Sequence, residues 1–262
     1  MNNNEKKIHS NSCTKSVDRA LLILSTFTES SPQQKVITIA NKLSMNPSTV
    51  SRHLTTLCNA NLIERDNNTG FYHLGNSIIT MAGNALMHNP AYRYSQNVLY
   101  NLSVRNGLNY QMTIPCGLEM VHLTGFCGLD SKDLPMPVGH RHPVYLTAMG
   151  RMYLSTLPDQ QIKQILNKCN IIEYNSYTKT DIDQIYDEIL LARKNGYCVV
   201  DNEITYGKCS VATPIFNINR ECVATISVTT HVENDKYSIS ELSKMMMVAA
   251  NNISSSMGYH SR

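Results

Sequence analysis

The clearest pattern in this chain is a pair of short amphipathic segments between residues 36 and 59. Ile39, Ala40 and Leu43 recur at helical spacing, so they share one apolar face. The pattern breaks at residues 44–46. Asn46 before Pro47 then marks a new helix start, because Asn accepts a hydrogen bond at the N-cap and Pro fits the first turn. The buried side of this second predicted helix carries three apolar positions: Val50, Leu54 and Leu57.

The opposite face of the second predicted helix is polar and has no carboxylate before Glu64. Hydroxyls and one guanidinium on such a face can reach phosphates and base edges in the DNA major groove without adding charge repulsion. Taken alone, a face of this kind is more often an ordinary solvated surface, so the neighbouring elements decide its interpretation. The residues expected to contact DNA from this helix are Ser48, Thr49, Ser51, Arg52 and Thr55.

A β-hairpin is predicted directly after these helices. Residues 62–65 and 71–74 are short strand-like runs around an Asp-Asn-Asn-Thr-Gly turn. Together with a helix predicted after Ser16, the elements form a winged helix–turn–helix. The hairpin tip can reach the DNA backbone or minor groove, although its two Asn residues fit an ordinary turn equally well. The residues expected to contact DNA here are Arg65, Asn67 and Asn68.

The rest of the chain predicts a linker helix and a larger second domain. Residues 76–90 have a helical pattern that is unusually apolar, so this helix could pack against a second copy of the chain. Residues 91–262 alternate strands and helices, which is typical of a mixed α/β domain with a mostly antiparallel sheet. One helix is expected to begin at Thr147, and another behind a capping box of Thr180 and Asp183. Strands are expected at residues 110–114, 120–123, 197–200, 210–216 and 222–229.

Charge and cysteine usage agree with an intracellular DNA-binding protein. The formal net charge is +3, and residues 1–90 hold 8 Lys and Arg against 5 Asp and Glu, so the surplus lies with the predicted helix–turn–helix. The eight cysteines form no C-x-x-C pair and follow no secretory signal, which favours reduced thiols. No apolar run approaches the ~18 residues of a membrane span. We therefore expect a soluble, cytoplasmic protein without a membrane partner.

A small-ligand pocket is predicted in the second domain. A helix that begins at Thr147 presents free N–H groups, which form a natural site for an anion. Ser227 and Thr229 alternate with Val228, so both point to one face of a strand, and Ser210 begins a neighbouring strand. Hydroxyls and a helix start describe a pocket for a small carboxylate, with no Lys or Arg required. Polar residues on a solvated strand face would give the same pattern.

Metal and thiol chemistry have weaker support in the sequence. His140, Arg141 and His142 near Cys127 match no zinc-site spacing, so no metal or cofactor is expected. Cys209 follows a lysine and could be an activated thiol, but no His–Asp partner can be assigned, which favours inert packing. The chain also lacks a Gly-rich phosphate loop, and no enzyme activity is expected.

Blocks of residues in both halves of the chain resemble the IclR family of bacterial transcription regulators, and the resemblance runs from about Ser16 to Met257. In the first half it rests on residues 16–20 (SVDRA), 39–43 (IANKL), 48–52 (STVSR) and 70–75 (GFYHLG). In the second half it rests on residues 138–139 (VG), 147–151 (TAMGR), 196–197 (GY) and 207–214 (GKCSVATP). Blocks in this order across both domains are more specific than the helix–turn–helix alone.

The resemblance implies an α+β fold with two domains: an N-terminal winged helix–turn–helix, and a C-terminal GAF-like mixed α/β domain that binds an effector. It also implies assembly into dimers or tetramers. This sequence departs from the family pattern at Ser44, which replaces a turn Gly, at His53, which replaces Leu, and at Val200, which replaces the first of two acids. The effector positions implied by the resemblance are Ala148, Met149, Asp201, Ser210, Ser227 and Thr229.

Three functions are compatible with this domain organisation. The favoured hypothesis is a DNA-binding regulator of a catabolic operon, whose affinity for an inverted-repeat operator is switched by a small organic acid. The alternatives are a thiol-dependent enzyme fused to a DNA-binding arm, and an architectural DNA binder without a ligand. The expected organisation is a disordered arm (residues 1–15), a winged helix–turn–helix (16–75), a linker helix (76–90) and an effector-binding domain (91–262).

Overall fold

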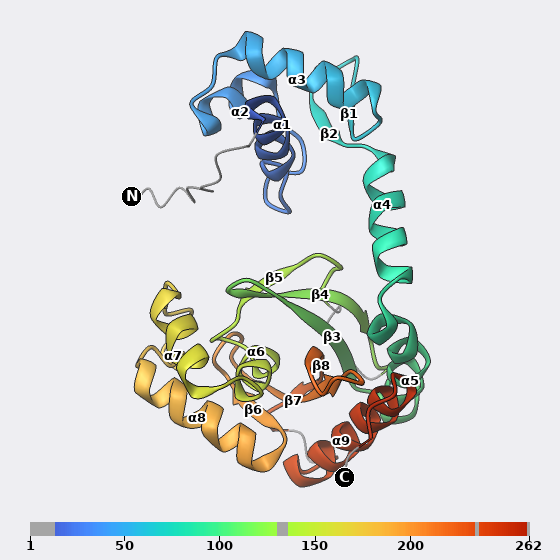
Figure 1. Ribbon diagram of the computed structural model, residues 1–262, viewed down its shortest axis with the longest axis vertical. Helices are drawn as coiled ribbons and strands as arrows, with labels where there is room; N and C mark the ends of the chain where they lie inside the picture. Colours follow the sequence, from blue (N-terminus) through green and yellow to red (C-terminus); the bar gives the residue numbers. More distant parts are fainter. Residues whose placement is uncertain (1–13, 130–135, 234–235, 261–262) are drawn as a thin grey trace. The chain divides into compact units, whose positions relative to one another are not determined.

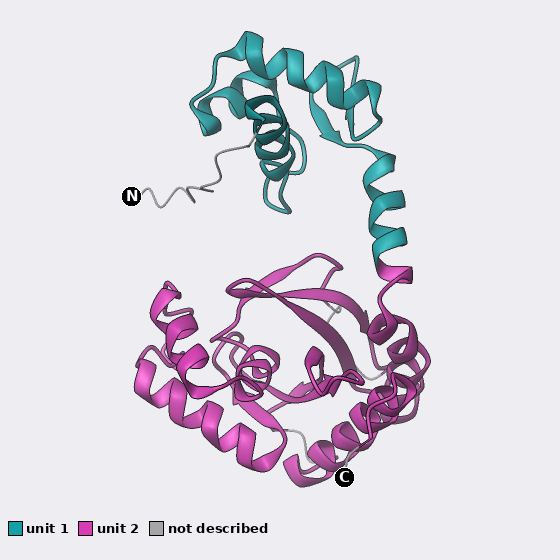
Figure 2. Ribbon diagram, viewed as in Figure 1, with its two compact units in different colours: residues 1–85 teal, residues 86–262 magenta. Residues whose placement is uncertain are grey.

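The computed structural model describes residues 14–129, 136–233 and 236–260, which form two compact units (Figure 1, Figure 2). The first unit ends at Ala85 and the second begins at Leu86. Most of the expected N-terminal arm, residues 1–13, lies outside the described residues, and Lys15 already begins a helix. None of the helices in the described part of the chain has the length and apolar character needed to span a bilayer.

The first unit is the predicted winged helix–turn–helix. Its elements in chain order are α1 (Lys15–Ser25), α2 (Val36–Leu43), α3 (Pro47–Asn59), β1 (Ile63–Arg65), β2 (Tyr72–Leu74) and α4 (Asn76–Met87), whose last two residues belong to the second unit. β1 and β2 pair antiparallel, with Glu64 opposite His73. The core takes apolar side chains from α1, α2, α3 and the hairpin, including Ile23, Ile39, Val50, Leu54 and Ile63, each with no exposed surface.

The turn between α2 and α3 depends on an unusual backbone conformation at Ser44. This residue has φ 52° and ψ 40°, in the left-handed region that L-residues with a Cβ seldom occupy. The conformation lets the Met45 N–H donate to the Ala40 carbonyl at 2.9 Å, which closes the end of α2. Asn46 then caps α3 as predicted, because its side chain accepts from the Ser48 N–H at 2.9 Å.

The second unit is built on one six-stranded sheet with strand order β5-β4-β3-β8-β7-β6, and every neighbouring pair is antiparallel. Its strands are β3 (Asn109–Cys116), β4 (Glu119–Phe126), β5 (Arg141–Pro143), β6 (Cys198–Asp201), β7 (Lys208–Phe216) and β8 (Cys222–His231). Its helices are α5 (Pro90–Asn106), α6 (Ala148–Ser155), α7 (Asp159–Lys168), α8 (Ile182–Asn195) and α9 (Ile239–Ser256).

The helices cover the two faces of this sheet differently. α5 and α9 lie together against one face (Figure 1), where Leu99 and Met246 pack on Met112 and Ile226 of the central strands. α6 lies against the other face, with α8 beside it, and Met152 packs there on Ala212. The period-two alternation of the strands therefore sorts apolar side chains toward α5 and α9 and leaves polar ones toward α6.

Two sequence-based predictions about helices are wrong or incomplete. α5 was not predicted, although Asn89 and Pro90 repeat the start signal of α3 and the Asn89 side chain accepts from the Tyr92 N–H at 3.0 Å. The predicted linker helix (76–90) includes this pair, whereas α4 ends at Met87 and α5 begins at Pro90. α8 is not capped by Thr180, because Asp181 is the N-cap and accepts from two backbone N–H groups. The short strand β5 was also missed.

Ser44→Gly is expected to raise the free energy of unfolding by roughly 0.5–1 kcal/mol, because glycine adopts the left-handed conformation without the Cβ penalty. Urea denaturation of the full chain measures the effect. The matched control is Ser51→Gly inside α3, where the same exchange is expected to lower stability by roughly 0.5 kcal/mol. Equal losses in both variants would show that position 44 does not favour a left-handed residue.

Candidate functional site

The polar face of α3 lies on the surface of the first unit, where the sequence predicted it. Arg52 and Thr55 are exposed, and Thr49 and Ser51 are half-buried. Two hydroxyls are already engaged inside the helix: Ser48 Oγ bonds Asn46 Oδ1 at 2.7 Å, and Thr55 Oγ1 donates to the Ser51 carbonyl at 3.0 Å. The Arg52 guanidinium is thus the main group on this face with several donors to offer a ligand.

The hairpin tip has a defined turn. Asp66 Oδ1 accepts from the backbone N–H of Asn68 at 2.8 Å and from that of Thr69 at 3.3 Å. The Thr69 side chain, followed by these two backbone bonds, lowers the pKa of the Asp66 carboxyl. Arg65 extends over the Tyr72 ring, with 5.7 Å from the guanidinium carbon to the ring centroid. Asn67 and Asn68 are exposed at the tip. Arg65 is therefore held at the base of the wing, while the two Asn side chains face solvent.

A cavity of about 470 Å³ lies in the second unit between α6 and the polar face of the sheet. Five of the six expected effector positions line it: Ala148, Met149, Ser210, Ser227 and Thr229. Asp201 is not among the lining residues. It pairs with Cys209 across β6 and β7 and is hydrogen-bonded to the Cys209 thiol. Alternation along β6 places its side chain on the opposite face from Val200, which does line the cavity.

The start of α6 is partly self-capped. Thr147 Oγ1 accepts from the Gly150 N–H at 2.9 Å, so this N–H group is not free for a ligand. The N–H groups of Ala148 and Met149 remain in the first turn, where a helix offers them no backbone acceptor. The predicted anion site at the start of α6 therefore has fewer free N–H donors than the sequence indicated.

Two hydrogen-bonding features in the cavity call for a partner. Ser227 Oγ is buried, its residue is 1% exposed, and no described residue bonds to it. Ser210 Oγ and Thr229 Oγ1 bond each other at 3.0 Å, which uses one of their two hydroxyl protons. An unbonded buried polar atom is costly unless a ligand or water satisfies it. Ser227 is thus the strongest single indication of a binding site.

A group of histidines forms one wall of the cavity. His122 on β4 and His142 on β5 both line it, with ring centroids 5.4 Å apart, and His140 lies 4.6 Å from His142. Burial, and after it the neighbouring imidazoles, lower the pKa of His122 to about 3 and that of His142 to about 4. Both rings are therefore neutral near pH 7. No three His, Cys, Asp or Glu side chains in the described ranges are arranged to hold a metal ion.

A buried ion pair holds the cavity wall beside α6. Arg151 has no exposed surface, and its guanidinium makes a bidentate contact with Glu203 at 2.7 Å for each oxygen, while its Nε donates to the Tyr145 carbonyl at 2.8 Å. Glu188 and Lys179 complete the network. Burial alone would raise the pKa of Glu203, but hydrogen bonds and charge from Arg151 and then Lys179 lower it below its ordinary value. Glu203 lines the cavity as a neutralised charge.

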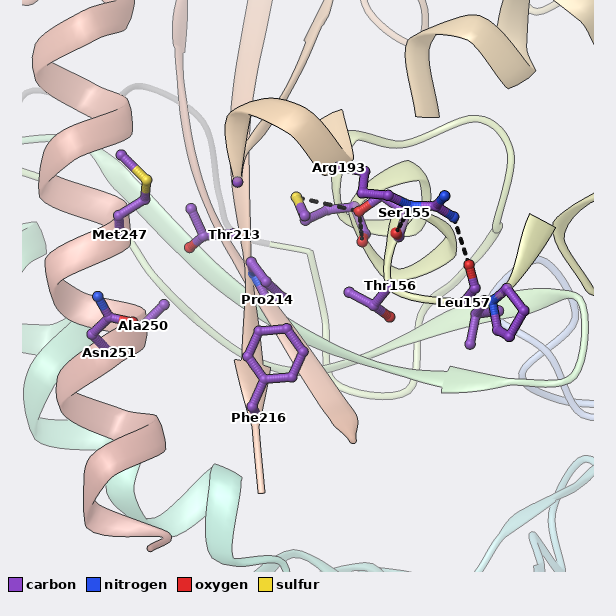
Figure 3. A pocket seen from close by; sticks show the side chains of 13 residues that line it. Ser155, Thr156, Leu157, Arg193, Thr213, Pro214, Phe216, Met247, Ala250 and Asn251 are labelled. Carbon is purple, nitrogen blue, oxygen red and sulfur yellow. Dashed lines mark hydrogen bonds between the residues drawn. The ribbon is translucent and has the colours of Figure 1, made fainter. Parts of the chain in front are cut away.

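A second cavity, of about 620 Å³, lies between α6, β7 and α9 (Figure 3). Two of its polar side chains, Arg193 and Thr213, already have hydrogen-bond partners. Arg193 donates to the carbonyls of Ser155 and Leu157 at 2.8 and 2.6 Å, and Thr213 donates to the Met246 carbonyl at 3.3 Å. Among the described residues, none lining it carries a buried polar atom without a partner. The smaller cavity is therefore the better candidate for a polar ligand.

Sequence reasoning missed several residues of the smaller cavity. Asn109, Gln111, His122 and Glu203 line it, but no local motif marks them. Alternation along β3 could have placed Asn109 and Gln111 on one face, because Tyr110 between them is apolar in character and buried. His122 and Glu203 carry no such signal.

Comparison with known protein families shows which family the chain belongs to. The family described as bacterial transcriptional regulator IclR C-terminal matches residues 84–255, and the IclR helix-turn-helix domain matches residues 16–67. The chain belongs to the IclR family. IclR proteins are DNA-binding transcriptional regulators with a C-terminal effector-binding domain, so the resemblance noted in the sequence and the two-domain fold it implied are both confirmed.

Several IclR relatives align with most of this chain. The regulator XynR of Escherichia coli is 24% identical over 245 residues, which cover 93% of this chain and 97% of XynR. The Pca regulon regulatory protein of Pseudomonas putida is 26% identical over 218 residues, or 83% and 74% of the two chains. The solved IclR regulator of Alicyclobacillus acidocaldarius has a TM-score of 0.83 at 22% identity, covering 94% and 100%. An IclR homolog of Microbacterium hydrocarbonoxydans, complexed with 4-hydroxybenzoate, has a TM-score of 0.80 at 20% identity, covering 93% and 99%.

Arg151→Met is expected to lower the free energy of unfolding by about 3–5 kcal/mol, because it leaves the Glu203 carboxylate buried without its partner. Chemical denaturation at pH 7 measures the loss. Adding Glu203→Gln removes that charge and should recover part of it.

The control for this ion pair is Arg141→Met. Arg141 pairs with Glu119 at the surface, with side chains 46% and 41% exposed, and its loss should cost no more than about 1 kcal/mol. If the Arg151 and Arg141 variants lost equal stability, the buried pair would have no special role.

Proposed function

We propose that this IclR protein regulates a catabolic operon, and that a small organic acid bound in the cavity beside α6 switches its affinity for operator DNA. The observation that carries the proposal is the buried Ser227 hydroxyl without a partner, in a cavity whose wall is the start of a helix. The winged helix supplies the DNA-binding half of the function. Ala148, Met149, Ser210 and Thr229 are the proposed effector contacts beside Ser227.

Asp201 receives a different proposed role from the other five effector positions. Its side chain bonds the Cys209 thiol on the sheet face away from the cavity. A carboxylate there cannot touch a ligand held between Ser227 and α6. We assign Asp201 to the support of β6 and β7.

DNA is read by α3 and the wing in this proposal. The contacts come from Ser48, Thr49, Ser51, Arg52 and Thr55 on the helix, and from Arg65, Asn67 and Asn68 on the hairpin. Exposed hydroxyls position a helix on phosphates, whereas a guanidinium can also make a bidentate contact with guanine. Arg52 is therefore the residue expected to contribute most to operator affinity.

A second copy of the chain is the proposed partner of the apolar helices in the first unit. α4 buries none of its residues within the chain, and Ile79 and Met81 on it are 71% and 58% exposed. On α1, Val17 and Leu21 are four residues apart and are 54% and 58% exposed. Apolar stripes of this kind are buried in dimers, and a two-fold dimer places two recognition helices on an inverted repeat.

The leading alternative, a thiol-dependent enzyme, has less support. Burial raises the pKa of the thiols of Cys169 and Cys198, and the value for Cys198 reaches about 12. The pKa of Cys209 is raised by burial and then by Asp201. A nucleophilic thiol needs the opposite shift. The raised values favour structural roles for these cysteines.

Arg52→Ala is expected to weaken operator binding by ~1–3 kcal/mol, while a mere loss of phosphate contact would weaken all DNA sequences alike. Operator is first recovered by pulldown and sequencing of genomic DNA, and affinity is then measured at matched salt by fluorescence anisotropy. The control is Arg105→Ala, which removes the same charge from an exposed position on α5 of the other unit. Unchanged operator affinity in a folded Arg52 variant would exclude the assigned face.

Ser227→Ala combined with Thr229→Val is expected to abolish the response to the metabolite of the neighbouring operon, because it removes two hydroxyl partners of the effector. Coupling between such sites is typically ~1–3 kcal/mol and is reciprocal, so operator DNA should shift effector affinity in the wild type by the same factor. Operator binding without metabolite reports whether the variant is folded. A normal metabolite response in the double variant would place the effector elsewhere.

A further inference from the structure

The floor of the cavity beside α6 is polar but largely uncharged. Three adjacent strands supply it, and the antiparallel register places the side chains side by side. Gln111 on β3 lies opposite Ser227 on β8, and Asn109 lies opposite Thr229. Thr229 in turn lies opposite Ser210 on β7. Two amides and three hydroxyls thus form one continuous patch of donors and acceptors.

His122 extends this patch onto β4 and adds a demand that an anion alone cannot meet. The residue is 1% exposed, and neither ring nitrogen has a partner among the described residues. A neutral imidazole carries one N–H donor and one bare nitrogen acceptor. A carboxylate can accept from the N–H, but it has no proton for the bare nitrogen. A ligand hydroxyl can serve either atom.

The charged groups near the cavity leave room for one ligand carboxylate. Glu203 is committed to Arg151 through both oxygens. Lys208 bonds His231 at 3.0 Å. The first turn of α6 offers N–H groups that suit a single anionic end. Apart from Lys208, no lysine or arginine lines the cavity in the described ranges, so a ligand with two or three carboxylates would lack enough matching cations beside Glu203.

We propose that the effector is a hydroxylated carboxylic acid of the sugar-acid class, with its carboxylate at the start of α6 and its hydroxyls on the polar floor. His122 is the specificity-determining residue for the hydroxyls, together with Gln111. This inference rests on the proposed function, because it names the ligand of the same site. An aromatic acid fits less well, since no aromatic ring other than the two imidazoles lines the cavity in the described ranges.

The test is calorimetric titration of the full chain with five probes: D-gluconate, D-galactonate, hexanoate, D-glucitol and benzoate. Hexanoate keeps the six carbons and the carboxylate without hydroxyls, whereas D-glucitol keeps the hydroxyls without a carboxylate. We expect one of the two sugar acids to bind roughly 100-fold more tightly than hexanoate and D-glucitol, because several hydroxyl contacts add to one anionic contact. Benzoate is included as the aromatic comparison.

Equal or tighter binding of hexanoate or benzoate, or no binding of either sugar acid, overturns the inference. The proposed function is tested separately through operator binding. A protein that binds its inverted repeat and responds to an aromatic or aliphatic acid keeps the proposed function and loses only the sugar-acid assignment. A protein that binds a sugar acid without any effect on operator affinity has the ligand class but not the switch.

The variant His122→Phe keeps a planar ring and removes both ring nitrogens. Its affinity for the sugar acid is expected to fall at least roughly tenfold, with hexanoate affinity unchanged. A purely structural effect would weaken both probes alike and would contradict the assignment. Gln111→Leu provides the same test from β3 if the His122 variant does not fold. The matched control is Thr156→Val, which removes a hydroxyl from the other cavity (Figure 3) and should leave sugar-acid affinity unchanged.

Discussion

The contact between Arg151 and Glu203 is the constraint on which the second unit depends. It joins α6 to the segment after β6, and through Glu188 and Lys179 it also reaches α8 and the segment before it. A buried guanidinium is costly unless its donors are satisfied, and here carboxylates and the Tyr145 carbonyl satisfy them. Because Glu203 lines the cavity, the pair also decides its electrostatics: a carboxylate neutralised by Arg151 leaves the anionic position to a ligand.

The sheet contributes to the binding site because its two faces differ in polarity: one is apolar and packs on helices, and the other is polar and lines the cavity. Along β8, Ile226 and Val228 pack toward α5 and α9, while Ser227 faces the cavity. The apolar face supplies the stability that allows the other face to remain polar and incompletely bonded. A domain with both faces apolar would be more stable and would have nowhere to bind a hydroxyl or an acid.

The winged helix and most of the sheet could be predicted because their signals are local. Asn46 with Pro47, the apolar spacing of α3 and the turn after Arg65 each lie within a few residues. Five of six expected effector positions also meet around one cavity. His122 and Glu203 could not be found in this way, because His122 enters through the order of strands and Glu203 through a contact with a residue 52 positions away. Asp201 is not among the residues that line the cavity, and a motif position carries no information about the strand face that its side chain occupies.

The hydrogen bond between Ser210 and Thr229 has a property that the other contacts of the cavity lack. Either hydroxyl can be its donor, so the bond can reverse direction without moving a heavy atom. The hydroxyl proton that is not used in this bond can therefore be donated to a ligand from Ser210 on β7 or from Thr229 on β8. The pair thus tolerates either orientation of a ligand oxygen. The His122 ring can also move its proton from one nitrogen to the other, but the directions in which the two nitrogens bond are fixed by the ring plane. In a regulator with this cavity floor, substitutions at His122 would change which ligand stereoisomer is preferred. The Ser210–Thr229 pair would accept different orientations of the ligand oxygen.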